Sequence, residues 1–66
     1  MKIGNQLQVI MDKRNLTYRQ LERMTGISHT TLNKIAIGDT SPTQNTMISI
    51  AKGLRMDVTE IFDLKY

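Results

Sequence analysis

The sequence has no cysteine, no tryptophan, one proline, one histidine and few aromatic residues (two tyrosines and one phenylalanine). Without cysteine, neither a disulfide nor a cysteine-based metal site can reinforce a chain of 66 residues, so its stability must come from packing or association. No apolar stretch approaches the roughly 20 residues of a membrane helix, and the first residues lack the apolar run of a signal peptide. We expect one cytoplasmic domain over residues 1–66.

The remaining absences bear on chemistry. The single histidine, His29, stands among scattered carboxylates, which is too few ligands for a metal site. Ser28 and Thr30 flank this histidine, but no acid orients the pair and a surface helix offers no pocket for nucleophilic catalysis. We therefore expect neither an enzyme nor a protein with a bound metal, cofactor or small-molecule ligand.

The charge is unevenly distributed along the chain. Residues 1–38 hold six Lys or Arg against two Asp or Glu, whereas residues 39–66 hold three against four. A basic half indicates a polyanionic partner such as nucleic acid. On charge alone, an ordinary solvated surface explains the pattern equally well.

Apolar residues recur at helical intervals almost throughout the chain. Ile3, Leu7, Ile10 and Met11 form one stripe, which predicts a first helix from about Lys2 to Arg14. The same reasoning predicts four more helices: Tyr18 to Thr25, His29 to Ile37, Gln44 to Leu54, and a short last helix that follows Asp57 and carries Val58, Ile61, Phe62 and Leu64. No strand pattern competes, so the expected class is an all-α domain of five short helices.

The residues between these helices are typical of helix ends. Thr17 and Gln20 have the spacing of a capping box at the start of the second helix. Gly26 can adopt the positive φ of a helix end, Ser28 is a suitable N-cap for the third helix, and Gly38 follows its last turn.

The second and third predicted helices are joined by a turn that contains Gly26, which is the plan of a helix-turn-helix. Leu32, Ile35 and Ala36 share one face of the third helix. The opposite face then presents these residues: His29, Thr30, Asn33, Lys34 and Ile37. Such side chains can read base edges in a major groove, although an ordinary surface helix would look the same. For the apolar Ile37 we favour packing under the loop at Asp39 over contact with a thymine methyl group or a sugar.

A family resemblance supports the interpretation that this face reads DNA bases. The segment "TYRQLERMTGISHTTLNKIAIG" resembles the helix-turn-helix of the lambda-repressor-like (Cro/repressor, XRE-type) regulators. Matching positions in that segment are Thr17, Leu21, Gly26, Ile27, Ser28, Thr31, Leu32 and Gly38. The segment "SPTQNTMISIAKGLRMDVTEIF" is similar to the fourth and fifth helices of that family. Matching positions there are Pro42, Thr46, Ile50, Ala51, Leu54, Glu60 and Phe62.

The resemblance implies a transcriptional regulator, most often a repressor, that binds double-stranded operator DNA as a homodimer on an inverted repeat. By this correspondence His29, Thr30 and Asn33 would read bases, and Lys34 would reach a base or a phosphate. Phosphate contacts would come from the start of the second helix, the loop after the third and the start of the fourth. The residues at those places are Thr17, Tyr18, Arg19, Gly38, Thr40, Ser41, Asn45 and Thr46.

Three departures from the family pattern affect these expectations. Tyr18 replaces a common glutamine, and its hydroxyl either binds a phosphate or packs across the surface of the helical hairpin. Asp39 replaces a common loop lysine, so it should weaken non-specific DNA binding unless it caps the turn. Arg55 stands where a helix-ending glycine is frequent, which predicts a strained turn or a different helix end.

The last helix is too short to bury all of its apolar residues internally. We therefore expect a dimer interface among them, with closure of the monomer core as the alternative. The candidates for this interface are Val58, Ile61, Phe62, Leu64 and Tyr66. A protein-interaction module of the same fold, an antitoxin or adaptor with weak or no DNA binding, is the alternative function.

Overall fold

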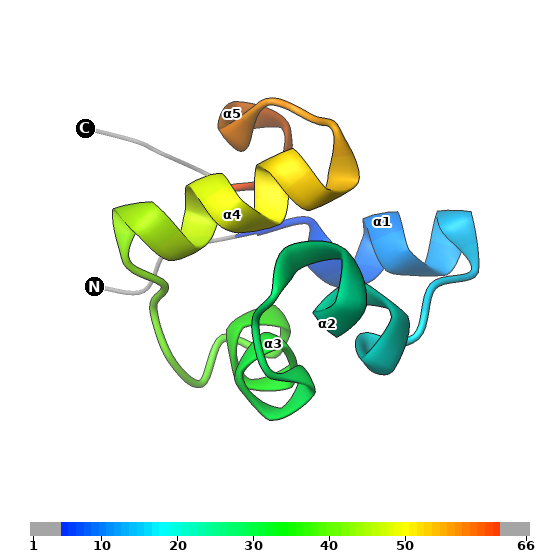
Figure 1. Cartoon of the computed structure of the whole chain (residues 1–66). Coiled ribbons are helices and arrows are strands. Elements are labelled where there is room, and N and C mark those ends of the chain that lie inside the picture. The colour runs from blue at the N-terminus through cyan, green and yellow to red at the C-terminus, as the bar shows by residue number, and fades with distance from the viewer. Residues whose placement is uncertain (1–4, 63–66) are drawn as a thin grey trace.

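The computed structural model describes residues 5–62, and within that range the chain is entirely helical apart from turns, loops and one isolated bridge (Figure 1). The helices are α1 (Leu7–Arg14), α2 (Tyr18–Thr25), α3 (His29–Ala36), α4 (Gln44–Leu54) and α5 (Val58–Ile61). The all-α, five-helix prediction is thus confirmed. The bounds of α2 and α4 agree with those predicted, and α3 ends one residue earlier.

The core is built from the apolar stripes of all five helices. α2 packs against α3 on one side and against α4 on the other, and α5 packs against α4. The buried apolar residues are Leu7, Ile10, Met11, Leu21, Leu32, Ile35, Met47, Ile50, Ala51, Leu54, Ile61 and Phe62. Among the described residues none with a polar or charged side chain is buried, so the helices associate through apolar packing.

The predicted start of α1 is wrong. α1 begins at Leu7, because Asn5 forms an antiparallel bridge with Phe62 and the backbone N–H of Gln6 donates to the carbonyl of Ile61 (2.7 Å). The side chain of Asn5 accepts from the N–H of Leu7 (3.1 Å) and donates to the carbonyl of Ile35 in α3 (3.0 Å). These contacts hold residues 5 and 6 outside the helix; residues 1–4 lie outside the described range.

The predicted caps are largely confirmed. Thr17 and Gln20 form the capping box of α2, in which Thr17 Oγ1 accepts from the N–H of Gln20 (3.1 Å). α3 ends in a Schellman motif: Gly38 has φ +82°, and the N–H of Asp39 donates to the carbonyl of Lys34 (2.8 Å). Arg55 has φ +58° at the end of α4, so the strained turn predicted there is present.

Two of the residues predicted to lie in a dimer interface are buried within the monomer instead. Ile61 and Phe62 are 1% and 2% exposed, so for these two the alternative, closure of the core, is correct. Their burial follows from the bridge that pairs the end of α5 with Asn5. Val58 is half-buried against the core, while Leu64 and Tyr66 lie outside the described residues.

Candidate nucleic-acid interface

The turn between α2 and α3 is fixed by a short series of hydrogen bonds. Gly26 has φ +78°, a conformation that glycine adopts without steric cost, and its N–H donates to the carbonyl of Glu22 (2.7 Å). The hydroxyl of Thr25 donates to the carbonyl of Leu21 (2.8 Å) and accepts from the N–H of Ile27 (3.2 Å). The turn is therefore held by backbone groups together with the hydroxyl of Thr25.

α3 separates its residues into a buried and an exposed face, as predicted. Leu32 and Ile35 are 0% and 1% exposed, and Ala36 packs partly against the core. On the outer face, three of the predicted base readers are exposed, namely Thr30, Asn33 and Lys34. The fourth, His29, is half-buried. The structure thus brings all four to one surface of one helix.

The prediction that Ile37, at the end of α3, packs under the loop at Asp39 is wrong. Its exposed fraction is 68%, the largest among the exposed large apolar residues of the described chain. It does not pack under the loop at Asp39, because the Schellman motif turns the chain away at Gly38 through backbone bonds alone. Ile37 therefore adds an apolar group to the exposed face.

The N-terminus of α3 is capped by α2. Ser28 occupies the N-cap position, as predicted, but its side chain makes no capping bond. Instead, the carboxylate of Glu22 accepts from the backbone N–H of His29 (2.9 Å) and contacts Nδ1 of the His29 ring (2.7 Å). These bonds to the ring and to the backbone hold the pKa of Glu22 below its usual value, and the positive charge of Arg19 adds to the effect.

The phosphate-contact candidates lie on both sides of α3. In Figure 1, α3 occupies the lower edge of the molecule, between the start of α2 on its right and the loop to α4 on its left. Candidates with exposed side chains are Thr17, Arg19, Thr40, Ser41 and Asn45. The start of α2 and the loop that leads to α4 thus lie on either side of α3, and helix N-termini suit phosphate oxygens.

Tyr18 does not present a free hydroxyl. It packs partly against the core, and its hydroxyl bonds to the side-chain oxygen of Gln8 in α1, whose amide nitrogen donates to Asp12 (3.0 Å). Partial burial, and then the nearby charge of Asp12, raise the pKa of Tyr18 above its usual value. The hydroxyl of Tyr18 is thus engaged with α1, a contact that neither alternative for this residue had named.

In the loop after α3, the side chain of Asp39 does not cap the turn, and at the start of α4 the side chain of Thr46 is engaged. The backbone of Asp39 takes part in the Schellman motif, but its carboxylate, on an exposed residue, has no hydrogen-bond or ion-pair partner among the described residues. At the start of α4, Thr43 caps the helix by accepting from the N–H of Thr46 (3.2 Å), and the two hydroxyls are 2.9 Å apart. Thr46 is therefore less available to a phosphate than Asn45.

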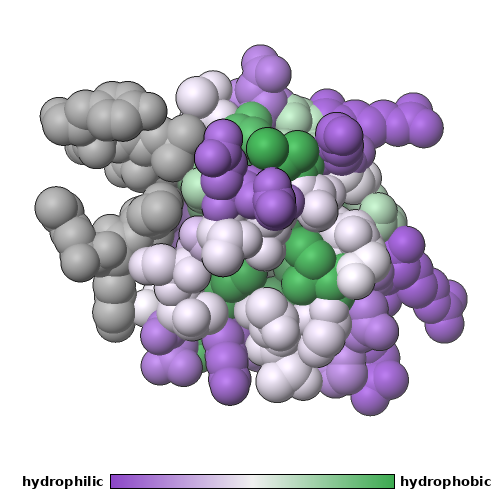
Figure 2. All heavy atoms as spheres, turned by 60° about the vertical axis from the view of Figure 1, so that its left-hand side comes forward, coloured by the Kyte–Doolittle hydropathy of each residue, from purple (hydrophilic) through white to green (hydrophobic). Residues whose placement is uncertain are grey.

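The exposed surface combines polar, basic and apolar side chains. Figure 2 shows, on the face it presents, small hydrophobic areas set among polar and weakly polar side chains. One basic side chain has a structural use, because Arg14 donates to the carbonyl of Leu54 at the end of α4 (2.8 Å). Arg19 and Lys34 are exposed and remain available near α3.

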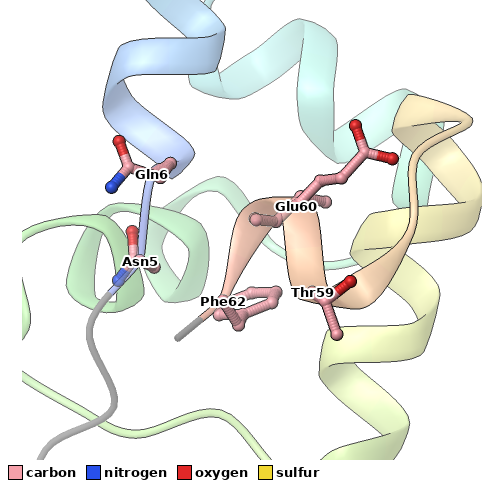
Figure 3. A pocket seen from close by; sticks show the side chains of 6 residues that line it. Asn5, Gln6, Thr59, Glu60 and Phe62 are labelled. Carbon is pink, nitrogen blue, oxygen red and sulfur yellow. The ribbon is translucent and has the colours of Figure 1, made fainter. Parts of the chain in front are cut away.

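Other kinds of site find little support within residues 5–62. A shallow hollow lies between the start of α1 and α5, lined by Asn5, Gln6, Thr59, Glu60, Ile61 and Phe62 (Figure 3). Its one ionisable side chain, Glu60, already accepts from the N–H of Asp57 (3.3 Å). In this part of the chain no group of three or more potential metal ligands occurs, and no helix is long and apolar enough to cross a membrane.

Sequence patterns do not indicate one residue that shapes this surface, Glu22. Glu22 caps α3 from another helix, and no local pattern predicts a bond between residues seven apart that belong to different helices.

Comparisons with known proteins match the chain to a family and to solved structures. A family model described as helix-turn-helix matches residues 7–61. The crystal structure of a candidate DNA-binding protein from Bacteroides fragilis is similar with a TM-score of 0.78 and 20% sequence identity, over 92% of this chain and 98% of that one. At this identity the likeness concerns the fold. No curated protein matches the sequence significantly.

Proposed function

Because the chain belongs to the XRE-type helix-turn-helix family, we propose that it is a sequence-specific DNA-binding transcriptional regulator, acting as a repressor. The observation that carries this proposal is the exposed polar face of α3, which stands on the buried residues Leu32 and Ile35. α3 would enter the major groove, with His29, Thr30, Asn33 and Lys34 against base edges.

The flanking residues would hold the DNA backbone. The start of α2 and the loop that leads to α4 flank α3 in Figure 1. Thr17 and Arg19 at the start of α2, and Asn45 at the start of α4, would therefore contact phosphates on the two sides of the groove. Thr40 and Ser41 in the loop would add further polar contacts, whereas the backbone N–H of Gly38 is engaged, because it donates to the carbonyl of Ile35 (3.1 Å). Tyr18 and Thr46 contribute less, since their hydroxyls are engaged within the protein.

One copy of the domain would read too few base pairs for useful specificity. We therefore infer a homodimer on an inverted repeat, with half-sites about one helical turn, roughly 10 base pairs, apart. Since Ile61 and Phe62 are buried, the interface candidates are reduced to Val58 with Leu64 and Tyr66.

Binding of a fluorescent random duplex at two salt concentrations tests the general proposal. DNA binding predicts that log K falls linearly with log salt, with a slope of about −0.9 per neutralised phosphate. The protein-interaction alternative predicts no salt-sensitive binding at micromolar protein. A duplex selected from a random pool then gives the operator, and its half-site spacing tests the dimer.

Two substitutions on α3 test the docking geometry. Asn33→Ala should relax base preference at one position by about 1–3 kcal/mol, whereas Lys34→Ala should weaken all sequences evenly and reduce the salt slope by about one. Lys52→Ala removes an exposed charge from the last turn of α4 and serves as the matched control. Unchanged binding of the selected operator by both α3 variants would contradict the docking.

A further inference from the structure

The bond between α2 and α3 fixes the position of a proton on the exposed face. Glu22 Oε1 lies 2.9 Å from the backbone nitrogen of His29 and 2.7 Å from its ring nitrogen Nδ1. An ionised carboxylate can only accept hydrogen bonds, so both of these nitrogens must donate. A neutral His29 therefore carries its proton on Nδ1, and Nε2 is left as an acceptor.

Glu22 is well placed to impose this tautomer at neutral pH. A glutamate carboxylate is ionised at neutral pH, and the bonds from His29 and the charge of Arg19 lower the pKa of Glu22 further. Its hydrogen bond to the backbone of His29 keeps the carboxylate at the start of α3 however the ring moves. The side chain of His29 is 42% exposed, and Nε2 has no hydrogen-bond partner within residues 5–62.

We propose that Glu22 is a positioning residue for base recognition: it holds His29 as the Nδ1–H tautomer, so that Nε2 accepts a hydrogen bond from an exocyclic amine of adenine or cytosine. This inference rests on the proposed DNA-binding function. In the major groove the N6 amine of adenine and the N4 amine of cytosine donate, whereas N7 and O6 of guanine and O4 of thymine accept. A hydrogen-bond acceptor fixed at the start of α3 therefore favours adenine or cytosine, whose amines can donate to it. Opposite guanine or thymine, this acceptor would find no donor.

The tautomer can be measured without DNA. The chain has one histidine, so a long-range proton–nitrogen NMR correlation of ¹⁵N-labelled protein at pH 8 shows one imidazole. We expect the Nδ1–H pattern in the wild type and a mixture of tautomers in Glu22→Gln, because an amide can either donate or accept. Glu60→Gln, in the capping box of α5, is the control and should leave the pattern unchanged. A wild-type ring protonated mainly on Nε2 would overturn the proposal.

The base preference is measured on the selected operator. At each half-site position the exocyclic amine is deleted, by replacing adenine with purine or cytosine with 2-pyrimidinone. At one position we expect the deletion to weaken wild-type binding by about three- to tenfold, the worth of one neutral hydrogen bond, and to have no effect on His29→Ala. Glu22→Gln should lose part of this discrimination.

Two results would contradict the base preference. One is that no amine deletion is coupled to His29→Ala; the other is that the base read by His29 is guanine or thymine. Failure of any duplex to bind would instead contradict the proposed function, and with it the base preference. The NMR measurement still decides whether Glu22 sets the tautomer.

Discussion

Gly53 allows α4 to approach α2 closely, and its replacement by alanine is the sharpest test of the packing. A Cβ at this position would lie 2.6 Å from Cγ2 of Thr25, 2.8 Å from the carbonyl oxygen of Met24 and 3.1 Å from its carbon. Cβ atoms in proteins essentially never come within 3.0 Å of another atom, so the end of α2 would have to move.

The size of the effect follows from two opposing contributions. Alanine is favoured over glycine in a helix interior by about 1 kcal/mol. Against this, inserting a methyl group into a packed contact costs about 1–3 kcal/mol. The upper part of that range applies, because Met24 presents backbone and because the Thr25 methyl cannot rotate away without breaking the bonds of its hydroxyl to Leu21 and Ile27. Gly53→Ala should therefore destabilise the protein by about 2 kcal/mol, or roughly 10 °C in Tm.

Urea unfolding followed by far-UV circular dichroism measures this difference. Lys52→Ala, at the neighbouring exposed position, should change the unfolding free energy by less than about 0.5 kcal/mol. Thr25→Ser keeps the hydroxyl but removes the methyl group, so Gly53→Ala should cost about 1 kcal/mol less in that background. A gain in stability of about 1 kcal/mol from Gly53→Ala alone would refute the close approach, since propensity alone predicts that gain.

Three further predictions follow from helix ends and charges. Arg55→Gly relieves a positive φ and should raise the unfolding free energy by about 0.5–1 kcal/mol, whereas Lys52→Gly in the same helix should lower it by about 1 kcal/mol; urea unfolding compares them. The pKa of Glu22 in the folded state is below its usual value of 4.5. The stabilisation by its carboxylate is therefore complete above pH 4.5 and is lost as the pH falls through the folded-state pKa. The difference in Tm between wild type and Glu22→Gln should accordingly shrink on acidification. Asp39→Asn removes an exposed negative charge beside α3 and should tighten binding to a random duplex at low salt, with a smaller gain at high salt; equal gains at both would contradict an electrostatic cause.

Local patterns predicted most of the elements correctly. The bounds of α2 and α4, the capping box at Thr17, the positive φ of Gly26 and the end of α3 before Gly38 were all indicated by residues within a few positions of one another. The two faces of α3 also followed from helical periodicity, because Leu32 and Ile35 are three residues apart and both are buried.

Contacts between distant residues account for the errors. The stripe that begins at Ile3 predicted a longer α1, but Asn5 pairs instead with Phe62, 57 positions away, and the helix begins at Leu7. Phe62, at the other end of this pairing, is buried in the core, although its sequence context favoured a place in the dimer interface. The bond between Glu22 and His29 also depends on the angle between two helices, which periodicity does not specify.

The exposed face of α3 contributes little to the stability of the helix, because other groups hold the helix in place. Its side chains include several weak helix formers, so the helix does not form by propensity. Glu22 satisfies a backbone N–H at one end, the Schellman motif at Gly38 satisfies carbonyls at the other, and Leu32 and Ile35 hold the middle in the core. All of these anchors lie off the exposed face. Substitutions on that face can therefore change what the helix binds at little cost to folding, and His29 is the exception because its ring and backbone are both tied to Glu22.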